Sequence, residues 1–128
     1  MNWQDIALIV AAVIGIGIAV IHGMIIQRRM VRPFEEYFRS DERIEVLIRR
    51  LVPLMLHYST ICWILGGFAL IVAIWFEQGA RFATGLFVGC LYLSGAIIAL
   101  WATRGRHFAG ILYVIAVILI GLGINISG

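Results

Sequence analysis

Residues 6–26 read IALIVAAVIGIGIAVIHGMII, an apolar run of 21 residues without Asp, Glu, Lys or Arg. An uncharged run of about 18 or more apolar residues is long enough to cross the hydrocarbon core of a membrane as a helix. Inside lipid the backbone has to satisfy its own hydrogen bonds, and a helix does this within one segment. The preceding residues, MNWQD, lack the basic start of a secretory signal. We therefore interpret the run as a retained first span.

Three further runs of the same kind follow along the chain. Residues 54–76, 82–102 and 108–126 are apolar and contain no Asp, Glu, Lys or Arg. Hydrophobic residues make up 62% of the 128 residues and charged residues 13%, whereas soluble domains have about 45–50% and about 25%. The sequence therefore predicts an all-α membrane protein. It forms a single domain over residues 1–128, with four transmembrane helices in an antiparallel bundle.

The arginines predict the orientation of the chain. Nine of the ten basic residues lie between the first and second runs or between the third and fourth, and only Arg81 lies in the second connection. Because basic residues accumulate on the cytoplasmic side, we expect both termini outside the cytoplasm. All ten are Arg, which is typical of a GC-rich bacterial genome, so the expected location is a bacterial inner membrane. Four arginines near span ends are expected to face membrane lipids or a partner: Arg28, Arg29, Arg49 and Arg50.

The long first connection has a helical pattern of its own. Pro33 is expected to end the first helix, and Ser40 is a typical N-cap for a new one. We expect an amphipathic helix over about residues 41–51 that lies in the cytoplasmic interface and leads into the second span at Pro53. This helix is either a docking surface for a partner or lipid, or only an interfacial segment that connects to the second span. Its apolar side chains recur at i, i+3, i+4 and i+7: Ile44, Leu47, Ile48 and Leu51.

Small residues mark faces on which helices can approach closely. Small side chains at four-residue spacing let two helix backbones come near enough for dispersion to hold them. The contacts lie either within one bundle or, for the first helix, against another subunit, which would make the protein a homo-oligomer or part of a larger membrane complex. The residues are Ala11, Gly15, Ala19 and Gly23 in the first run and Gly85 and Gly89 in the third.

Two histidines lie inside the apolar runs, and a third, His107, immediately precedes the last run. On the expected topology, His22 and His57 lie at similar depth near the cytoplasmic ends of the first two spans. Two histidines from facing helices can bind a b-type haem axially, and with His107 they could hold a metal ion. The alternative is that each hydrogen-bonds to a neighbouring helix or a water. The tetrapeptide HYST at 57–60 could instead line a cavity open to the inner leaflet.

The layout of spans and connections resembles that of the MAPEG family of membrane glutathione-dependent enzymes. The similarity is clearest in DERIE at 41–45, IRR at 48–50 and RGR at 104–106. The start of the second span does not match the family's Arg, Asn and Glu, because residues 51–54 read LVPL, so no functional residue is carried over. The resemblance implies a homotrimer that acts on lipophilic substrates and holds a thiol ligand near Arg49, Arg50 and Arg104.

The function predicted first is that of a non-catalytic integral inner-membrane protein, an accessory, assembly or scaffold subunit acting through helix–helix and lipid contacts. No charge lies inside a run to carry protons, and the sequence offers no catalytic pair, P-loop or metal motif. A nucleic-acid partner is not expected, because the net charge of +3 comes from arginines at span ends. The alternatives are a MAPEG-like enzyme or lipophile-binding protein, and a haem-binding electron-transfer anchor.

Overall fold

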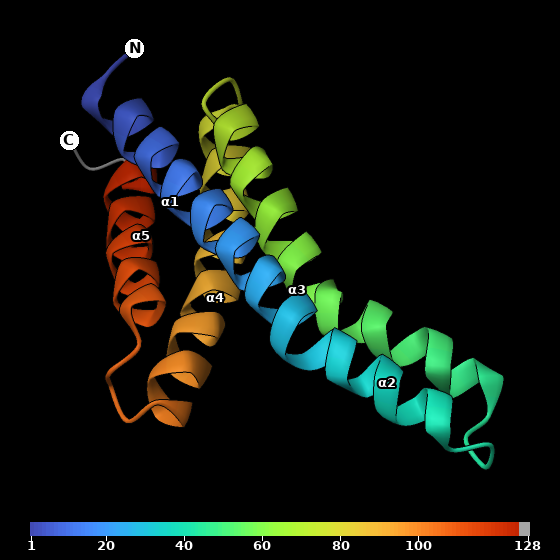
Figure 1. Ribbon diagram of the computed structural model, residues 1–128. Helices are drawn as coiled ribbons and strands as arrows, with labels where there is room; N and C mark the ends of the chain where they lie inside the picture. The colour runs from blue at the N-terminus through green and yellow to red at the C-terminus, as the bar shows by residue number, and fades with distance from the viewer. Residues whose placement is uncertain (126–128) are drawn as a thin grey trace.

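A computed structural model describes residues 1–125, and every regular element in that part of the chain is helical. Residue 126, the expected end of the last run, lies outside the described residues. The first three elements follow one another without a break, so that a single helical rod extends from Trp3 to Ser40 (Figure 1). The elements are α1 (Trp3–Ile26), the π-helical segment η1 (Gln27–Val31), α2 (Arg32–Ser40), α3 (Val46–Ala73), α4 (Gln78–Ala102) and α5 (Phe108–Ile124).

Three of the helices are long and apolar enough to cross a membrane. They are the rod Trp3–Ser40, α3 and α4, with 38, 28 and 25 residues. The apolar helix α5 has 17 residues and is therefore about 25 Å long at about 1.5 Å per residue, which is shorter than a hydrocarbon core of about 30 Å. The three long helices agree with the predicted membrane class, whereas α5 falls short of a spanning length within the described residues.

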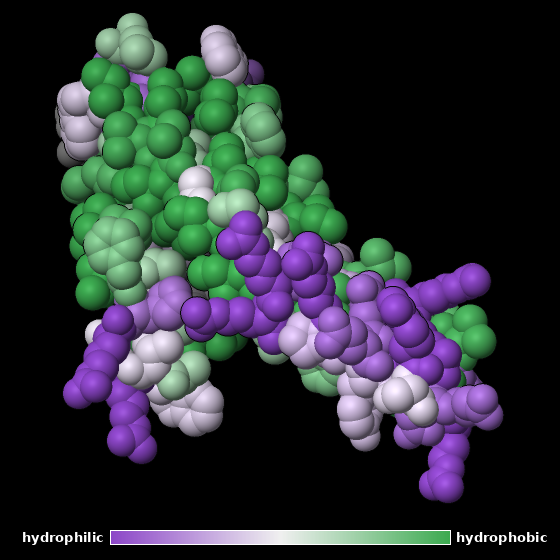
Figure 2. Space-filling model, viewed as in Figure 1, coloured by the Kyte–Doolittle hydropathy of each residue, from purple (hydrophilic) through white to green (hydrophobic). Residues whose placement is uncertain are grey.

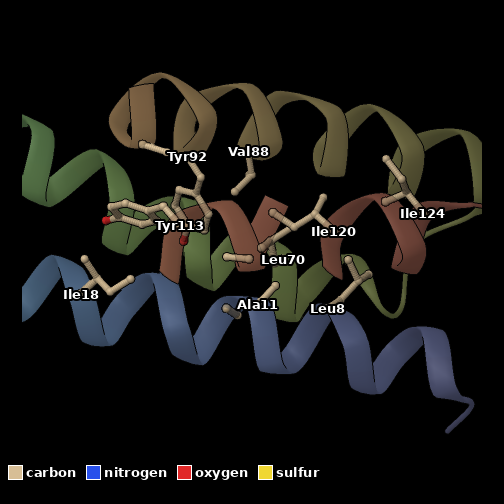
Figure 3. Packing of buried hydrophobic residues seen from close by; sticks show 12 residues of the cluster. Leu8, Ala11, Ile18, Leu70, Val88, Tyr92, Tyr113, Ile120 and Ile124 are labelled. Carbon is tan, nitrogen blue, oxygen red and sulfur yellow. The ribbon is translucent and has the colours of Figure 1, made fainter. Parts of the chain in front are cut away.

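The helices pack around one apolar core. Helix α1 lies against α3 and α5, and α4 lies against α5 and, less extensively, α3. Leu8 of α1, Leu70 of α3 and Val88 of α4 are fully or almost fully buried where these helices meet (Figure 3). Lipid provides no hydrophobic drive between helices, so shape complementarity and dispersion have to hold such a core together. The small residues of α1 and α4 explain how the helices come close enough.

The small face of α1 is used inside the chain. A Cβ atom added at Gly15 would overlap the phenol of Tyr92 on α4, and one added at Gly23 would lie 2.9 Å from Thr60 Cγ2 on α3. The alanines of this face, Ala11 and Ala19, are fully buried. The small residues at four-residue spacing therefore pack against other helices of the same chain, and no second copy of the protein is needed to explain them.

The glycines of α4 face α5. A Cβ atom at Gly85 would overlap Cγ2 of Ile124, and one at Gly89 would lie 3.6 Å from Cγ2 of Ile120. The second distance is an ordinary van der Waals contact, so Gly85 is the closer of the two approaches. Both glycines lie in the interface that the sequence pattern predicted for close helix packing.

The predicted break at Pro33 is wrong. In a regular helix the proline ring would collide with the carbonyl of residue i−4 and would remove one hydrogen bond. Here the π-helical turn Gln27–Val31 ends two residues before the proline, which occupies the first turn of α2. A π-helical turn is wider than an α-helical one. The rod therefore continues past Pro33 to Ser40.

The separate amphipathic helix expected at 41–51 is also wrong. Residues 41–45 form a turn in which Asp41 Oδ1 accepts a hydrogen bond from the Arg43 amide at 3.0 Å, and α3 begins only at Val46. From there α3 continues through Pro53 without a break. The apolar periodicity at 44–51 thus marks the first turns of α3. Helix α2 and the start of α3 form a hairpin that projects away from α4 and α5, with a largely hydrophilic surface (Figures 1 and 2).

Candidate functional site

A cavity of about 380 Å³ lies between α1, α3, α4 and α5, next to the turn from α4 to α5. Helix α4 diverges from α1 and α3 toward this turn (Figure 1). The molecule therefore has two arms, one formed by the end of α4 with the α4–α5 turn and the other by the α2–α3 hairpin, and a notch separates them (Figure 2). Ligand sites in proteins are commonly about 300–1,000 Å³ and mostly apolar with a few polar groups. The polar and aromatic residues of the lining are His22, Ser59, Trp63, Thr103, His107 and Tyr113.

A second cavity of about 130 Å³ adjoins the first one. Ile18, His22, His107 and Ala109 line both spaces. The two histidine rings, from α1 and from the start of α5, therefore stand between the cavities. The structure thus brings His22 together with His107, which the sequence placed at the same interface.

The turn from α4 to α5 forms one end of the cavity. Arg104 and Gly105 both have positive φ angles, 52° and 77°. The Gly105 amide donates to the Leu100 carbonyl at 2.7 Å, a bond that closes the end of the helix. This reversal makes His107 the N-cap residue of α5. On the α4 side the cavity wall consists mainly of small residues, including Gly95 and Ala99, which leave the space that a larger side chain would fill.

Aromatic rings form the deep wall of the cavity. The Trp63 ring lies 4.8 Å from the His22 ring and 5.0 Å from the Tyr113 ring, measured between centroids. Tyr92 packs behind Tyr113 at 5.1 Å and donates its hydroxyl hydrogen to the Trp63 carbonyl oxygen at 3.0 Å. Both tyrosines lie at the Ile18 end of the core cluster (Figure 3). Edge and tilted contacts of this kind are favourable for aromatic rings, so rings from four helices hold the wall in place.

Two polar groups of the lining residues are buried without a partner among the described residues. They are the hydroxyl of Tyr113, whose residue is only 2% exposed, and Nδ1 of His107. Leaving such a group unsatisfied costs about 1–3 kcal/mol. Buried polar groups in native proteins nearly always find a partner, so the exceptions call for an explanation. Neither atom has appreciable accessible surface, so both lie within the packed wall and not at the surface of the cavity.

His57 is engaged elsewhere. Its Nε2 atom lies 2.8 Å from Oε1 of Gln27, and His57 is not among the residues that line either cavity. An axial haem ligand needs its ring nitrogen free and aimed at the iron, so this arrangement does not fit the haem site predicted for His22 and His57. Among the described residues, no three His, Cys, Asp or Glu side chains form a group that could hold a metal ion.

The predicted arginine sites lie on different parts of the molecule. Arg28, Arg29 and Arg50 are exposed, whereas Arg49 is half-buried and donates from Nη2 to the Asp41 carbonyl at 2.5 Å. Arg49 thereby helps to close the hairpin. Arg104 belongs to the turn on the other arm (Figure 1). Within one chain, the arginines implied by the MAPEG resemblance are therefore not gathered around one cleft.

At the opposite end of the bundle, a second polar cluster connects α1, α4 and α5. Arg81 at the start of α4 forms an ion pair with Asp5 of α1 at 2.6 Å and donates from Nε and Nη2 to the Gly123 carbonyl of α5 at 3.3 and 3.1 Å. Both charged side chains are largely shielded, with exposures of 13% and 16%. The hydrogen bond from Arg81 lowers the pKa of the Asp5 carboxyl below its ordinary value. This one cation therefore joins three helices.

Sequence reasoning missed the aromatic wall and the Asp5–Arg81 pair, although both left a signal. Trp63 and Tyr113 lie well inside apolar runs, whereas Trp and Tyr of membrane proteins are enriched at the ends of spans. Asp5 and Arg81 carry opposite charges at ends that the expected topology places on the same side. Both signals become specific only when the helices are known to be neighbours.

The fold and the cavity define an all-helical protein with three helices of membrane-spanning length and an aromatic-walled cavity between its arms. Comparisons of the chain with family models, with curated proteins and with solved structures found no match. The MAPEG resemblance therefore remains one of layout alone, and the cavity is the feature of the molecule that bears most directly on function.

Proposed function

We propose that the chain is a non-catalytic integral membrane protein that holds a lipophilic small molecule in the cavity beside Trp63. One observation carries this proposal: a mostly apolar space of about 380 Å³ lies between α1, α3, α4 and α5 and is lined by a few polar and aromatic side chains. An apolar wall with a few fixed polar groups is the usual form of a small-molecule site.

In the proposed topology α1, α3, α4 and α5 all cross a bacterial inner membrane in an antiparallel bundle. Helix α5 is short, but it packs against α1 and α4 and would therefore share their depth in the membrane. The distribution of arginines supports a cytoplasmic location for the α2–α3 hairpin and for the α4–α5 turn. The cavity would then open toward the inner leaflet, from which a lipophilic molecule could enter sideways.

Native mass spectrometry of the detergent-purified protein tests the proposal. We expect a bound molecule of small mass, and we expect Ala102→Phe to remove it. Ala102 lines the cavity and is exposed, so a larger side chain there would fill the space without displacing the core. Ala83→Phe is the matched control, because Ala83 is exposed on the same helix and does not line the cavity. Equal occupancy in both variants would contradict the proposal.

A role as an accessory or assembly subunit is the second candidate, and the α2–α3 hairpin favours it. The hairpin projects beyond the other helices (Figure 1) and exposes Tyr37 at 63% and Leu47 at 61%. Exposed aromatic and aliphatic side chains among charges are typical of surfaces that meet a partner. The same spectra test this role: a homo-oligomer or a co-purified protein lost on Tyr37→Ser with Leu47→Ser would support it. A monomer in native lipid would contradict it.

A further inference from the structure

We infer that the cavity takes an acyl chain of an anionic phospholipid of the inner leaflet, whose phosphate is held by the arginines of the α4–α5 turn. This inference rests on the proposed function, because it names the ligand of the same cavity. Three features lead to it: the cations beside the cavity, their lack of partners within the chain, and the separation of these charges from the apolar lining.

Cations adjoin the cavity on both arms. In the α4–α5 turn, the exposed Arg104 and Arg106 lie between Thr103 and His107, which line the cavity. On α1, Ile25 lines the smaller adjoining cavity. Two exposed arginines follow within about one helical turn of it, Arg28 and Arg29. Figure 2 shows hydrophilic surface on both arms and apolar surface on the body of the bundle. Both arms are therefore basic beside the notch.

These four arginines have no partner within the described part of the chain. None of their side chains forms a hydrogen bond or an ion pair there, and the one ion pair among residues 1–125 joins Asp5 to Arg81. The sequence places no acid beside them either, because Glu77 is the last acidic residue of the chain and residues 27–32 contain none. Arginine holds phosphate by charge-assisted hydrogen bonds, and basic side chains near an anionic membrane surface attract its lipids. The partner that fits them is an anion from outside the chain.

The cavity itself has no charge to match an anion. No Asp, Glu, Lys or Arg lines it, and an unpaired charge in an apolar space is costly. A free phosphate would therefore gain nothing from the cavity. A phospholipid separates its apolar chains from its phosphate, so a chain can enter the apolar space while the phosphate stays at the exposed turn. The residues next to the turn are suited to lipid, since Trp101 is 83% and Phe108 73% exposed. The arrangement thus favours a lipid over a soluble anion.

The experiment compares two phospholipids that share their chains and differ in the charge of the head group. The affinities of dioleoyl phosphatidylglycerol and dioleoyl phosphatidylcholine are measured on the purified full chain by native mass spectrometry. We expect the anionic lipid to bind more tightly. Arg104→Gln with Arg106→Gln should reduce this preference about 5- to 30-fold, the contribution of one or two basic side chains near a membrane surface. Arg43→Gln with Arg50→Gln is the matched control, because both side chains are exposed on the α2–α3 hairpin and neither lines the cavity. Ala102→Phe should weaken the binding of both lipids, because it fills the space for the chain.

The failures of the inference and of the proposed function are distinguishable. If both lipids bind equally and Ala102→Phe weakens both, the inference about the anionic head group is overturned while a lipophile site remains. If the two pairs of Arg→Gln substitutions reduce the preference alike, or if neither does, the assignment of the phosphate to the α4–α5 turn is overturned. If the anionic lipid is preferred but Ala102→Phe changes nothing, the lipid binds the surface and the inference is wrong. If neither lipid binds and Ala102→Phe also leaves the native mass unchanged, both the inference and the proposed function are wrong.

Discussion

Replacing Gly15 by Ala would place a methyl group in space that the Tyr92 phenol occupies. The Cβ atom would overlap the hydroxyl and the neighbouring ring carbon. Tyr92 has no room to move aside, because it is fully buried and its hydroxyl is bonded to the Trp63 carbonyl at 3.0 Å. We therefore expect α1 and α4 to separate slightly or Tyr92 to leave its rotamer and lose that bond.

The magnitude follows from three contributions. Overpacking a filled core costs about 1–3 kcal/mol, and loss of the Tyr92 hydrogen bond adds about 0.5–1.5 kcal/mol. The higher helix propensity of Ala offsets about 1 kcal/mol. The free energy of unfolding should thus fall by about 0.5–3.5 kcal/mol. Gly17→Ala is the control on the same helix, since nothing lies within 4 Å of a Cβ atom there, and it should gain up to about 1 kcal/mol.

The assay is reversible unfolding in mixed micelles of a mild detergent and dodecyl sulfate, followed by helical circular dichroism. The two substitutions are chemically identical and lie two positions apart on α1, so the denaturant and the micelle act equally on both. A Gly15→Ala protein that is as stable as Gly17→Ala, or more stable, would refute the packing described for this helix.

Three further predictions concern the remainder of the fold. Because hydrogen bonding from Arg81 lowers the pKa of Asp5, the ion pair should stabilise the protein above the ordinary carboxyl pKa, and this stability should be lost as pH falls through the lowered value. Asp5→Asn should flatten that dependence in unfolding measured between pH 3 and 7, and an unchanged profile would contradict it. Gly85→Ala should destabilise the α4–α5 contact by about 1–3 kcal/mol in the same assay, whereas Gly79→Ala, with open space around it, should not; equal losses would count against that contact. On a background without native cysteines, a membrane-impermeant maleimide should label Gly79→Cys in intact cells and Arg106→Cys only after lysis, and the reverse pattern would invert the topology.

The apolar runs made the membrane class predictable, because the length of an uncharged run can be read directly from the order of residues in the sequence. Small-residue spacing also predicted which faces of α1 and α4 come close to other helices, although not that Gly15 would meet Tyr92. The first connection was mispredicted for a local reason. The amphipathic pattern at 44–51 continues directly into α3, and the π-helical turn before Pro33 allows a proline that would otherwise end the rod.

The candidate site was only partly predictable. His22 was selected as an ionisable group inside a span, and the structure places it at the cavity. Which other histidine lies beside His22 depends on how each helix is rotated about its axis, and local sequence does not determine that rotation. In the structure His107 lines the same cavity, whereas His57 is hydrogen-bonded to Gln27. Tyr113 stands out only once burial shows that its hydroxyl lacks a partner.

The central claim, that the cavity beside Trp63 binds a lipophilic molecule, can be tested by fluorescence quenching. The other three tryptophans are exposed and can be replaced by Phe to leave Trp63 as the only emitter: Trp3, Trp75 and Trp101. Titration with a brominated naphthalene should then quench Trp63 to a saturating limit, and Ala102→Phe should abolish the saturable part. Quenching that rises linearly with concentration, and equally in the two proteins, would mean that the compound only partitions into the micelle and would contradict the account.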